Sequence, residues 1–264
     1  MSENRENIII EARDLTIRFG GVTAVNHVSF ELKAGEVLGV IGPNGSGKTT
    51  LFNLLSGIYV PTEGQIFLNG EDISGKQSNE VFTRGISRTF QNGRLFWNLS
   101  VLENIMVGLK EVRECSVLGS IIGAGKEKAQ AREAIAACLK HMEIFDDLLI
   151  RQADKTAKDL PYADRRRLEI CRAVASNPKV ILLDEPSAGM DSMETEKLMY
   201  DLLKVKKAMP ELTIIVVEHD MDFIKGLVDK VMVLNYGENI AYGTFDEVAG
   251  DEQVINAYLG QEGE

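Results

Sequence analysis

The chain has 264 residues, with 29 Lys plus Arg against 40 Asp plus Glu, and therefore a formal charge of −11 at pH 7. This length suits one large domain or two small ones and allows a sizeable buried core. The acidity argues against bulk attraction to nucleic acid or to an anionic bilayer, because both need a basic protein surface. Any membrane contact is therefore expected to run through a protein partner.

Neither a membrane anchor nor a disulfide framework is expected. No segment approaches the roughly 20 apolar residues that span a bilayer. The start, MSENRENIII, lacks the basic and apolar regions of a signal peptide. The three cysteines, Cys115, Cys138 and Cys171, are widely spaced and odd in number. We interpret them as reduced thiols of a cytosolic protein.

The first third of the chain is typical of short strands. Apolar residues alternate over 8–19, as in a half-buried strand, while the continuous apolar run 37–41 predicts a strand covered on both faces. Ile66 and Leu68 alternate again and lead into Asn69-Gly70, which is a strong hairpin signal.

The remainder alternates helices with strands. From about 101 to 149 the pattern is helical, with Ile135, Leu139 and Met142 at spacings of four and three. Alternation after this region predicts a mostly parallel sheet with helices on both faces and the helical middle as an insertion. The elements expected there are strands at 180–183 and 213–217, a helix over 194–209, and a closing hairpin from 231–234 and 240–242.

A glycine-rich loop follows the strand at 37–41. Residues 42–50 fit the pattern G-x-x-x-x-G-K-[ST] in the strand–loop–helix context that phosphate binding requires. Its backbone N–H groups are expected to form a nest for anionic oxygens at the positive end of the following helix. Lys48 is expected to reach the β- and γ-phosphates, and the Thr49 hydroxyl to bind Mg²⁺. The predicted nucleotide-binding residues are Gly42, Pro43, Asn44, Gly45, Ser46, Gly47, Lys48, Thr49 and Thr50.

A pair of acidic residues follows the apolar strand at 180–183. Ligands of parallel sheets bind at the carboxyl ends of the strands, where Asp184 is predicted to hold Mg²⁺. Glu185 is predicted to polarise the attacking water as a general base. An acidic pair alone is usually a solvated loop, but the phosphate-binding loop favours the functional interpretation.

These residues resemble the motifs of ATP-binding cassette (ABC) ATPase subunits, and the resemblance covers nearly the whole chain. It implies an α/β P-loop NTPase fold, in which a RecA-like, mostly parallel sheet has helices on both faces. An antiparallel β subdomain and an inserted α-helical subdomain complete this fold. We expect one ABC domain over 1–264, with about 1–95 and 176–264 as the ATPase core. The helical subdomain over about 96–175 would carry the signature motif.

Other motifs of the family follow in the expected order. Gln91 matches the Q-loop glutamine, which links Mg²⁺ to the helical insertion, and Ser187 to Asp191 match the D-loop. His219 matches the switch histidine that contacts the γ-phosphate, which implies a catalytic role beside Glu185 and Lys48. Phe19 lies where the family's aromatic side chain stacks on adenine. The alternatives are strand packing for Phe19 and a satisfied surface position for His219.

The signature position departs from the common Leu-Ser-Gly-Gly-Gln. The resemblance implies that these five residues bind, in trans, the nucleotide of a second subunit arranged head to tail. Pro161 replaces the serine, and side chains replace both glycines, which restricts the backbone. We therefore expect weaker closure on ATP than in a glycine variant. The residues concerned are Leu160, Pro161, Tyr162, Ala163 and Asp164.

The sequence around the signature is similar to one branch of the family, the larger ATPase subunit of bacterial uptake systems for branched-chain amino acids. The matching stretches are 160–170, 19–25 and 240–244. This similarity implies ATP and Mg²⁺ as cofactors and a second ATPase subunit as a partner. It also implies two membrane permease subunits, a periplasmic or extracellular binding protein, no nucleic acid, and a location at the cytoplasmic face of the inner membrane.

The permease is expected to dock near Gln91, where Leu95, Phe96 and Trp97 follow, although a core role for Trp97 is equally open. Arg165, Arg166 and Arg167 are expected to form a solvated helix face that nearby acids offset.

Two competing classes fit less well. Soluble ABC proteins of translation or DNA repair usually carry two cassettes or a long coiled-coil insertion. A P-loop kinase needs an acceptor site and a lid, and it does not explain the series formed by Gln91, the signature and His219.

Replacing Ala163 by Gly tests the altered signature. The variant should regain backbone freedom at this position and hydrolyse ATP faster than the wild type. Steady-state rates over a range of ATP concentrations would measure this, and equal rates at every concentration would contradict the prediction.

Overall fold

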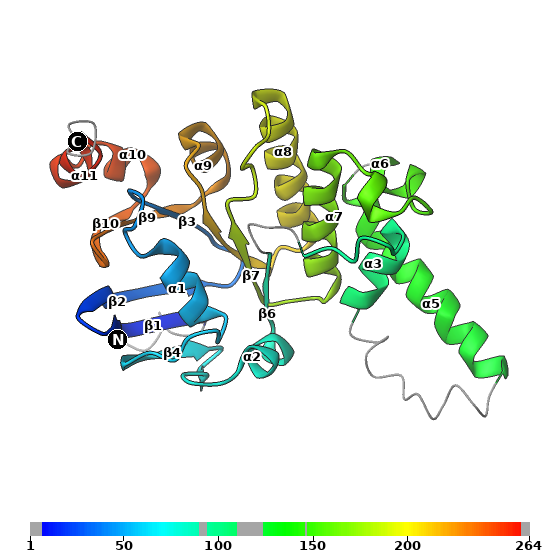
Figure 1. Cartoon of the computed structure of the whole chain (residues 1–264), viewed down its shortest axis with the longest axis horizontal. Helices are drawn as coiled ribbons and strands as arrows, with labels where there is room; N and C mark the ends of the chain where they lie inside the picture. Colours follow the sequence, from blue (N-terminus) through cyan, green and yellow to red (C-terminus); the bar gives the residue numbers. More distant parts are fainter. Residues whose placement is uncertain (1–6, 90–93, 110–123, 146, 260–264) are drawn as a thin grey trace. The chain divides into compact units, whose positions relative to one another are not determined.

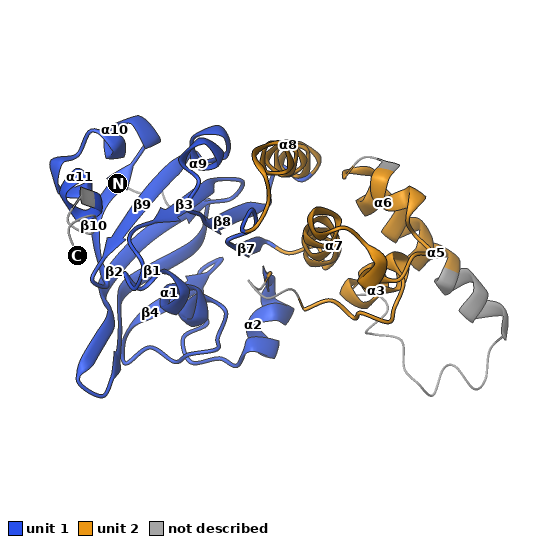
Figure 2. Ribbon diagram, turned by 45° about the horizontal axis from the view of Figure 1, so that its top comes forward, with its two compact units in different colours: residues 1–88, 179–188, 209–264 blue, residues 89–178, 189–208 orange. Residues whose placement is uncertain are grey.

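The computed structural model describes residues 7–89, 94–109, 124–145 and 147–259 (Figure 1). The chain divides into two compact units, which Figure 2 colours separately. Unit 1 comprises Met1–Arg88, Lys179–Ala188 and Met209–Glu264, and unit 2 comprises Thr89–Pro178 and Gly189–Ala208.

Unit 1 contains a four-stranded antiparallel sheet with the order β2-β1-β4-β5. The predicted hairpin at Asn69-Gly70 joins β4 to β5, with Phe67 opposite Asp72. Asn69 and Gly70 have φ angles of 50° and 77°, the left-handed pair that favours a tight hairpin. The strands are β1 (Ile8–Phe19), β2 (Val22–Lys33), β4 (Glu63–Leu68) and β5 (Glu71–Asp72).

The second sheet of unit 1 has six strands in the order β10-β9-β3-β8-β7-β6. All neighbours are parallel except the edge strand β10, which pairs antiparallel with β9 as the predicted closing hairpin. Every residue of β3, β7 and β8 is buried, as their continuous apolar runs predict. The strands are β3 (Val37–Ile41), β6 (Ile86–Arg88), β7 (Val180–Asp184), β8 (Thr213–Val217), β9 (Lys230–Asn235) and β10 (Glu238–Gly243).

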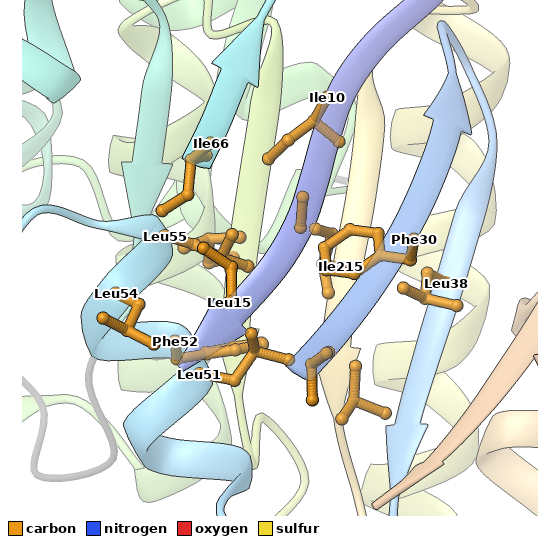
Figure 3. Close-up of a cluster of buried hydrophobic side chains, with 14 of the residues drawn as sticks. Ile10, Leu15, Phe30, Leu38, Leu51, Phe52, Leu54, Leu55, Ile66 and Ile215 are labelled. Atoms are coloured by element: carbon orange, nitrogen blue, oxygen red, sulfur yellow. The ribbon is translucent and has the colours of Figure 1, made fainter. Parts of the chain in front are cut away.

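One hydrophobic core joins the two sheets of unit 1 through helix α1. Figure 3 shows side chains of α1 in a cluster with side chains of both sheets. Each fully buried leucine or phenylalanine contributes about 1.5–3 kcal/mol, so this packing fixes α1 and the loop that leads into it. The helices of unit 1 are α1 (Lys48–Leu55), α2 (Ser78–Arg84), α9 (Met221–Leu227), α10 (Phe245–Ala249) and α11 (Glu252–Leu259).

Unit 2 is helical and is built around α7. None of the helices among the described residues has the length and apolarity needed to cross a membrane. Cys138 and Cys171 are buried free thiols of this unit, and burial raises the pKa of Cys171. Cys115 lies outside the described residues. The principal helices are α3 (Val101–Gly108), α5 (Ala124–Glu143), α6 (Asp147–Arg151), α7 (Tyr162–Ala175) and α8 (Ser192–Ala208).

The expectation that all three arginines at the start of α7 are solvated was wrong. Arg166 and Arg167 are each only 6% exposed. Arg166 Nη1 pairs with Glu169 Oε2 at 3.1 Å, and Arg167 Nε pairs with Asp201 Oδ2 of α8 at 2.7 Å. A buried charge needs a partner. The first pair lies within α7, and the second joins α7 to α8, which belongs to the same compact unit.

Candidate nucleotide site

The loop between β3 and α1 fits glycine alone at two positions. Gly42 has φ 146°, and a Cβ atom there would lie 2.0 Å from the carbonyl oxygen of Leu234 in β9. Gly47 has φ 105°, and its Cβ would lie 2.4 Å from the carbonyl oxygen of Ala24 in β2. The backbone of the loop is therefore packed closely against both sheets of unit 1 at these two positions.

Lys48, the first residue of α1, is held inside this loop. Its side chain is buried, and Nζ donates to the carbonyl oxygens of Gly42 at 2.7 Å and Pro43 at 2.8 Å. Burial lowers the pKa of Lys48, while the nearby charges of Glu185 and Asp184 oppose this shift. The loop thus holds the Lys48 ammonium group through hydrogen bonds to uncharged carbonyl oxygens.

Ser46 supplies an unsatisfied donor in the same loop. Its hydroxyl is buried and has no hydrogen-bond partner among the residues that the structure describes. Buried hydroxyls are rarely left unpaired, so an anionic oxygen in the loop fits this position. Asn44, Gly45 and Thr49 are exposed, and Thr50 is half-buried, so the predicted magnesium ligand Thr49 is accessible.

The base of the loop contacts the C-terminal helix α11. The backbone N–H of Gly42 donates to the hydroxyl of Tyr258. Burial raises the pKa of Tyr258, and this hydrogen bond opposes the rise. The sequence pattern gave no indication that residues more than two hundred positions apart meet here.

Asp184, the last residue of β7, is paired with an arginine that sequence reasoning missed. Arg88 ends the neighbouring strand β6, and its Nη2 lies 2.7 Å from Asp184 Oδ2. Both side chains are only 6% exposed. Arg88 lies three residues before Gln91, in the stretch Arg-Thr-Phe-Gln at 88–91. This proximity to a motif residue was the one sequence feature that pointed to Arg88.

Glu185 and His219 come together at the ends of β7 and β8. His219 Nε2 lies 3.2 Å from Glu185 Oε1, and Glu185 has the left-handed φ angle of 46°. Glu218, which the sequence analysis did not predict as a site residue, is buried and hydrogen-bonds to the backbone that follows β7 and β8. Its carboxylate accepts the N–H of Ser187 at 2.7 Å and the N–H of His219 at 3.0 Å. The predicted base, the histidine and the start of the D-loop segment are therefore joined in one network of unit 1.

Phe19 forms an exposed aromatic pair with Tyr59. The ring centroids are 5.2 Å apart at an interplanar angle of 68°, an edge-to-face contact. Phe19 is 46% exposed, which disfavours the alternative that it packs in the sheet core. Tyr59 follows α1 and was not anticipated from the sequence.

The signature residues lie in unit 2, and they differ in exposure. Leu160 and Ala163 are buried, while Pro161 and Tyr162 are exposed. Asp164 is only 6% exposed; its Oδ2 accepts a hydrogen bond from Gln152 at 3.0 Å, and its Oδ1 pairs with Arg167 at 3.1 Å. This carboxylate is therefore engaged within its own unit.

Gln91 lies outside the described residues, but the segment that follows it does not. Leu95 is buried, whereas Phe96 and Trp97 are 48% and 44% exposed. Arg172 lies 5.7 Å from the ring centre of Phe96, and Arg165 lies 5.4 Å from that of Trp97. Trp97 is thus a surface residue stacked on a cation, and the core alternative for it is wrong.

Comparison with known proteins supports the resemblance to ABC ATPase subunits. The family described as "ABC transporter" matches residues 25–188, and the family "Branched-chain amino acid ATP-binding cassette transporter" matches residues 238–264. The chain is 37% identical to the high-affinity branched-chain amino acid transport ATP-binding protein BraF of Pseudomonas aeruginosa. It is 36% identical to the corresponding protein LivG of Escherichia coli K12. Each alignment covers 96% of this chain and 98% of the relative.

Solved structures agree with these relatives. An ATP-binding cassette of an ABC transporter in its ADP conformation superposes with a TM-score of 0.81 at 30% identity, covering 96% of this chain and 99% of that one. A dimeric bacterial ABC transporter cassette gives a TM-score of 0.73 at 26% identity, covering 90% and 99%. The chain belongs to the ABC transporter family, as an ATP-binding subunit, and the predicted P-loop NTPase fold is confirmed.

Replacing Gly42 by Ala tests the close approach of the loop to β9. The added methyl would meet the backbone of Leu234, so the variant should lose stability and nucleotide affinity. Gly45→Ala is the matched control, because Gly45 also has positive φ but has open space around its Cβ position. Thermal unfolding should show the larger loss for Gly42→Ala; equal losses would mean that backbone conformation alone, without the clash, decides the cost.

Proposed function

We propose that this ATPase subunit energises the import of branched-chain or related hydrophobic amino acids. The proposed substrate class rests on the match of residues 238–264 to the branched-chain amino acid cassette family. BraF and LivG, which align over almost the whole chain, are described as branched-chain amino acid transport proteins. The substrate itself would be bound by other subunits of the importer.

In this proposal, the loop binds the phosphates of ATP. Lys48 exchanges its two carbonyl acceptors for β- and γ-phosphate oxygens. The negative charge of these oxygens would favour the ammonium form and oppose the lowering of the Lys48 pKa by burial. The Ser46 hydroxyl gains an acceptor, and backbone N–H groups within the loop 42–50 donate to the phosphates. The N–H groups of Gly42 and Ser46 are already engaged by Tyr258 and by the carbonyl oxygen of Pro43. Phe19 and Tyr59 offer aromatic surface to the adenine, where base stacking is worth roughly 1–3 kcal/mol.

Glu185 is proposed as the general base for hydrolysis. Its carboxylate takes a proton from the water that attacks the γ-phosphate. His219 contacts Glu185 Oε1 and is suited to orient that carboxylate and to reach the γ-phosphate. Glu218 keeps His219 in place through the backbone, so the two groups need little reorganisation during the reaction.

The chain also offers ligands for Mg²⁺. Thr49 and Asp184 present oxygen atoms, the donor type that this hard cation prefers, and Gln91 is proposed as a further ligand. When bound, Mg²⁺ would neutralise charge that develops on the phosphate oxygens.

We propose that two ATPase subunits face each other head to tail. The dimeric cassette that superposes on this chain supports a pair of subunits. Pro161 and Tyr162 are the signature side chains exposed for contact with the partner's nucleotide. Leu160, Ala163 and Asp164 would shape the same turn from inside unit 2. Because the methyl of Ala163 is buried, the Ala163→Gly comparison needs a parallel measurement of unfolding.

A pair of permease subunits is proposed to hold this ATPase at the cytoplasmic face of the membrane, with the binding protein on the opposite side. Phe96 and Trp97 form an exposed aromatic surface a few residues after Gln91. Aromatic side chains are enriched in the centres of protein interfaces, which favours this surface as the docking site. Leu95 is unsuitable as a probe, because a charge placed on its buried side chain would destabilise unit 2.

Replacing Glu185 by Gln tests the general base. The variant should hydrolyse ATP about 10²–10⁴-fold more slowly, since the amide cannot accept the proton from water, while ATP binding is retained. Phosphate release by the complex with its permease and equilibrium ATP binding measure the two effects. Glu63→Gln, on an exposed strand residue, is the control, and a variant that hydrolyses at the wild-type rate would exclude Glu185 as the base.

Charge placed at the exposed aromatic surface tests permease docking. The double substitution Phe96→Glu and Trp97→Glu should prevent copurification of this chain with the permease from membranes. Tyr236→Glu is a matched control, because Tyr236 is an aromatic residue that is 84% exposed in unit 1. Undiminished copurification of a folded double variant would place the docking surface elsewhere.

A further inference from the structure

Arg88 is held by several side chains, and the proposed reaction assigns it no role. Its Nη1 donates to Asn53 Oδ1 at 2.7 Å and to Ser56 Oγ at 3.0 Å, while Nη2 pairs with Asp184. The guanidinium also lies 5.5 Å from the ring centre of Phe52. Three of these contacts come from α1 and the residue that follows it, and one comes from the end of β7.

Arg88 pairs with one of the two carboxylate oxygens of Asp184. Arg88 engages only Oδ2, at 2.7 Å. Within the part of the chain that the structure describes, Oδ1 of Asp184 makes no hydrogen bond. The arginine therefore fixes the orientation of the carboxylate and leaves one oxygen for another ligand.

The electrostatics follow from burial. An ionised carboxylate with 6% of its side chain exposed needs a positive charge or hydrogen-bond donors beside it, and Arg88 supplies both to Asp184. Lys48 is the other cation nearby, but its ammonium donates to the carbonyl oxygens of Gly42 and Pro43. Arg88 is thus the direct counter-charge of Asp184. A divalent cation that approaches Oδ1 would share this carboxylate with the guanidinium, and the two positive charges would repel each other.

We propose that Arg88 is a positioning residue that regulates magnesium binding. It neutralises Asp184 when Mg²⁺ is absent and presents Oδ1 to the metal. It also keeps the metal affinity below what a lone buried carboxylate would give, so that the cation is able to leave with the product. This inference rests on the proposed role of Asp184 as a magnesium ligand.

Arg88 also lies at the end of β6, the last residue of its segment of unit 1. The next residue, Thr89, belongs to unit 2, and Gln91 follows two residues later.

The test measures how strongly Mg²⁺ enhances nucleotide binding. Binding of the non-hydrolysable analogue AMP-PNP to the full chain is titrated calorimetrically in excess Mg²⁺ and in EDTA, so that no hydrolysis is required. The ratio of the two affinities is compared among wild type, Arg88→Gln, Arg88→Met and Arg88→Lys. Arg84→Met is the matched control, since Arg84 pairs with Glu71 on a more exposed surface of unit 1.

Loss of the positive charge should raise the ratio. In Arg88→Gln and Arg88→Met we expect an enhancement by Mg²⁺ at least about tenfold greater than in wild type, because the metal then relieves an unpaired buried carboxylate. Their melting temperatures should fall in EDTA and recover with Mg²⁺ and AMP-PNP. Arg88→Lys, which keeps the charge, and Arg84→Met should retain the wild-type ratio.

The outcomes separate the two proposals. If wild type binds AMP-PNP equally well in Mg²⁺ and in EDTA, the assignment of a magnesium site fails. If wild type shows the enhancement but Arg88→Gln has an equal or smaller ratio, the regulatory role of Arg88 is overturned. If Arg88→Lys behaves like Arg88→Gln, the geometry of the guanidinium and not its charge is decisive, and the counter-charge argument fails. Arg88→Gln retains hydrogen bonding and keeps the test available if Arg88→Met does not fold.

Discussion

The candidate site depends on the pairing of charges at one edge of a parallel sheet. Strands β3, β8, β7 and β6 are consecutive neighbours, and their carboxyl ends bring together the phosphate loop, Glu218, Asp184 and Arg88. Each of these charged groups, as well as Lys48, is largely removed from solvent. Each buried charge is stabilised by a different kind of partner. Lys48 donates to loop carbonyls, Glu218 accepts from backbone N–H groups, and Asp184 pairs with a guanidinium. The site is therefore preorganised by contacts within unit 1, because burying any of these charges without its partner would cost several kcal/mol.

Sequence patterns were sufficient wherever the cause is local. The hairpin at Asn69-Gly70 follows from two residues that accept positive φ, and the buried strands follow from unbroken apolar runs. The phosphate loop is also local, since its glycines, its lysine and the start of the helix are contiguous. Such features can be recognised without knowing which segments meet in space.

What sequence reasoning missed depends on long-range pairing. Arg88 and Asp184 are 96 positions apart, and Glu218 reaches Ser187 over 31 positions. Arg166 and Arg167 look like a solvated helix face when only the residues of α7 are considered, yet Asp201 of α8 makes burial of Arg167 possible. Asp201 lies 34 positions from Arg167, so a periodicity argument restricted to α7 does not reveal it. The same reasoning applies to Asp164, which replaces a glutamine of the common signature and is held by Gln152 and Arg167.

The net charge of −11 poses a problem for a protein that binds a highly charged anion, and the site solves it locally. Exposed surface charges are screened beyond about 8 Å at physiological ionic strength, so most of the acidic surface has little effect on the nucleotide. Buried groups are screened much less, and here each one is a cation or an acid engaged by a guanidinium or by backbone N–H groups. In the proposed function, Lys48 and backbone N–H groups attract the phosphates, while Arg88 offsets the charge of Asp184. If Arg88 also limits the attraction of Asp184 for a metal, as we propose, the Arg88–Asp184 pair serves two purposes. It offsets a negative charge near the phosphates, and it sets how firmly the accompanying cation is held.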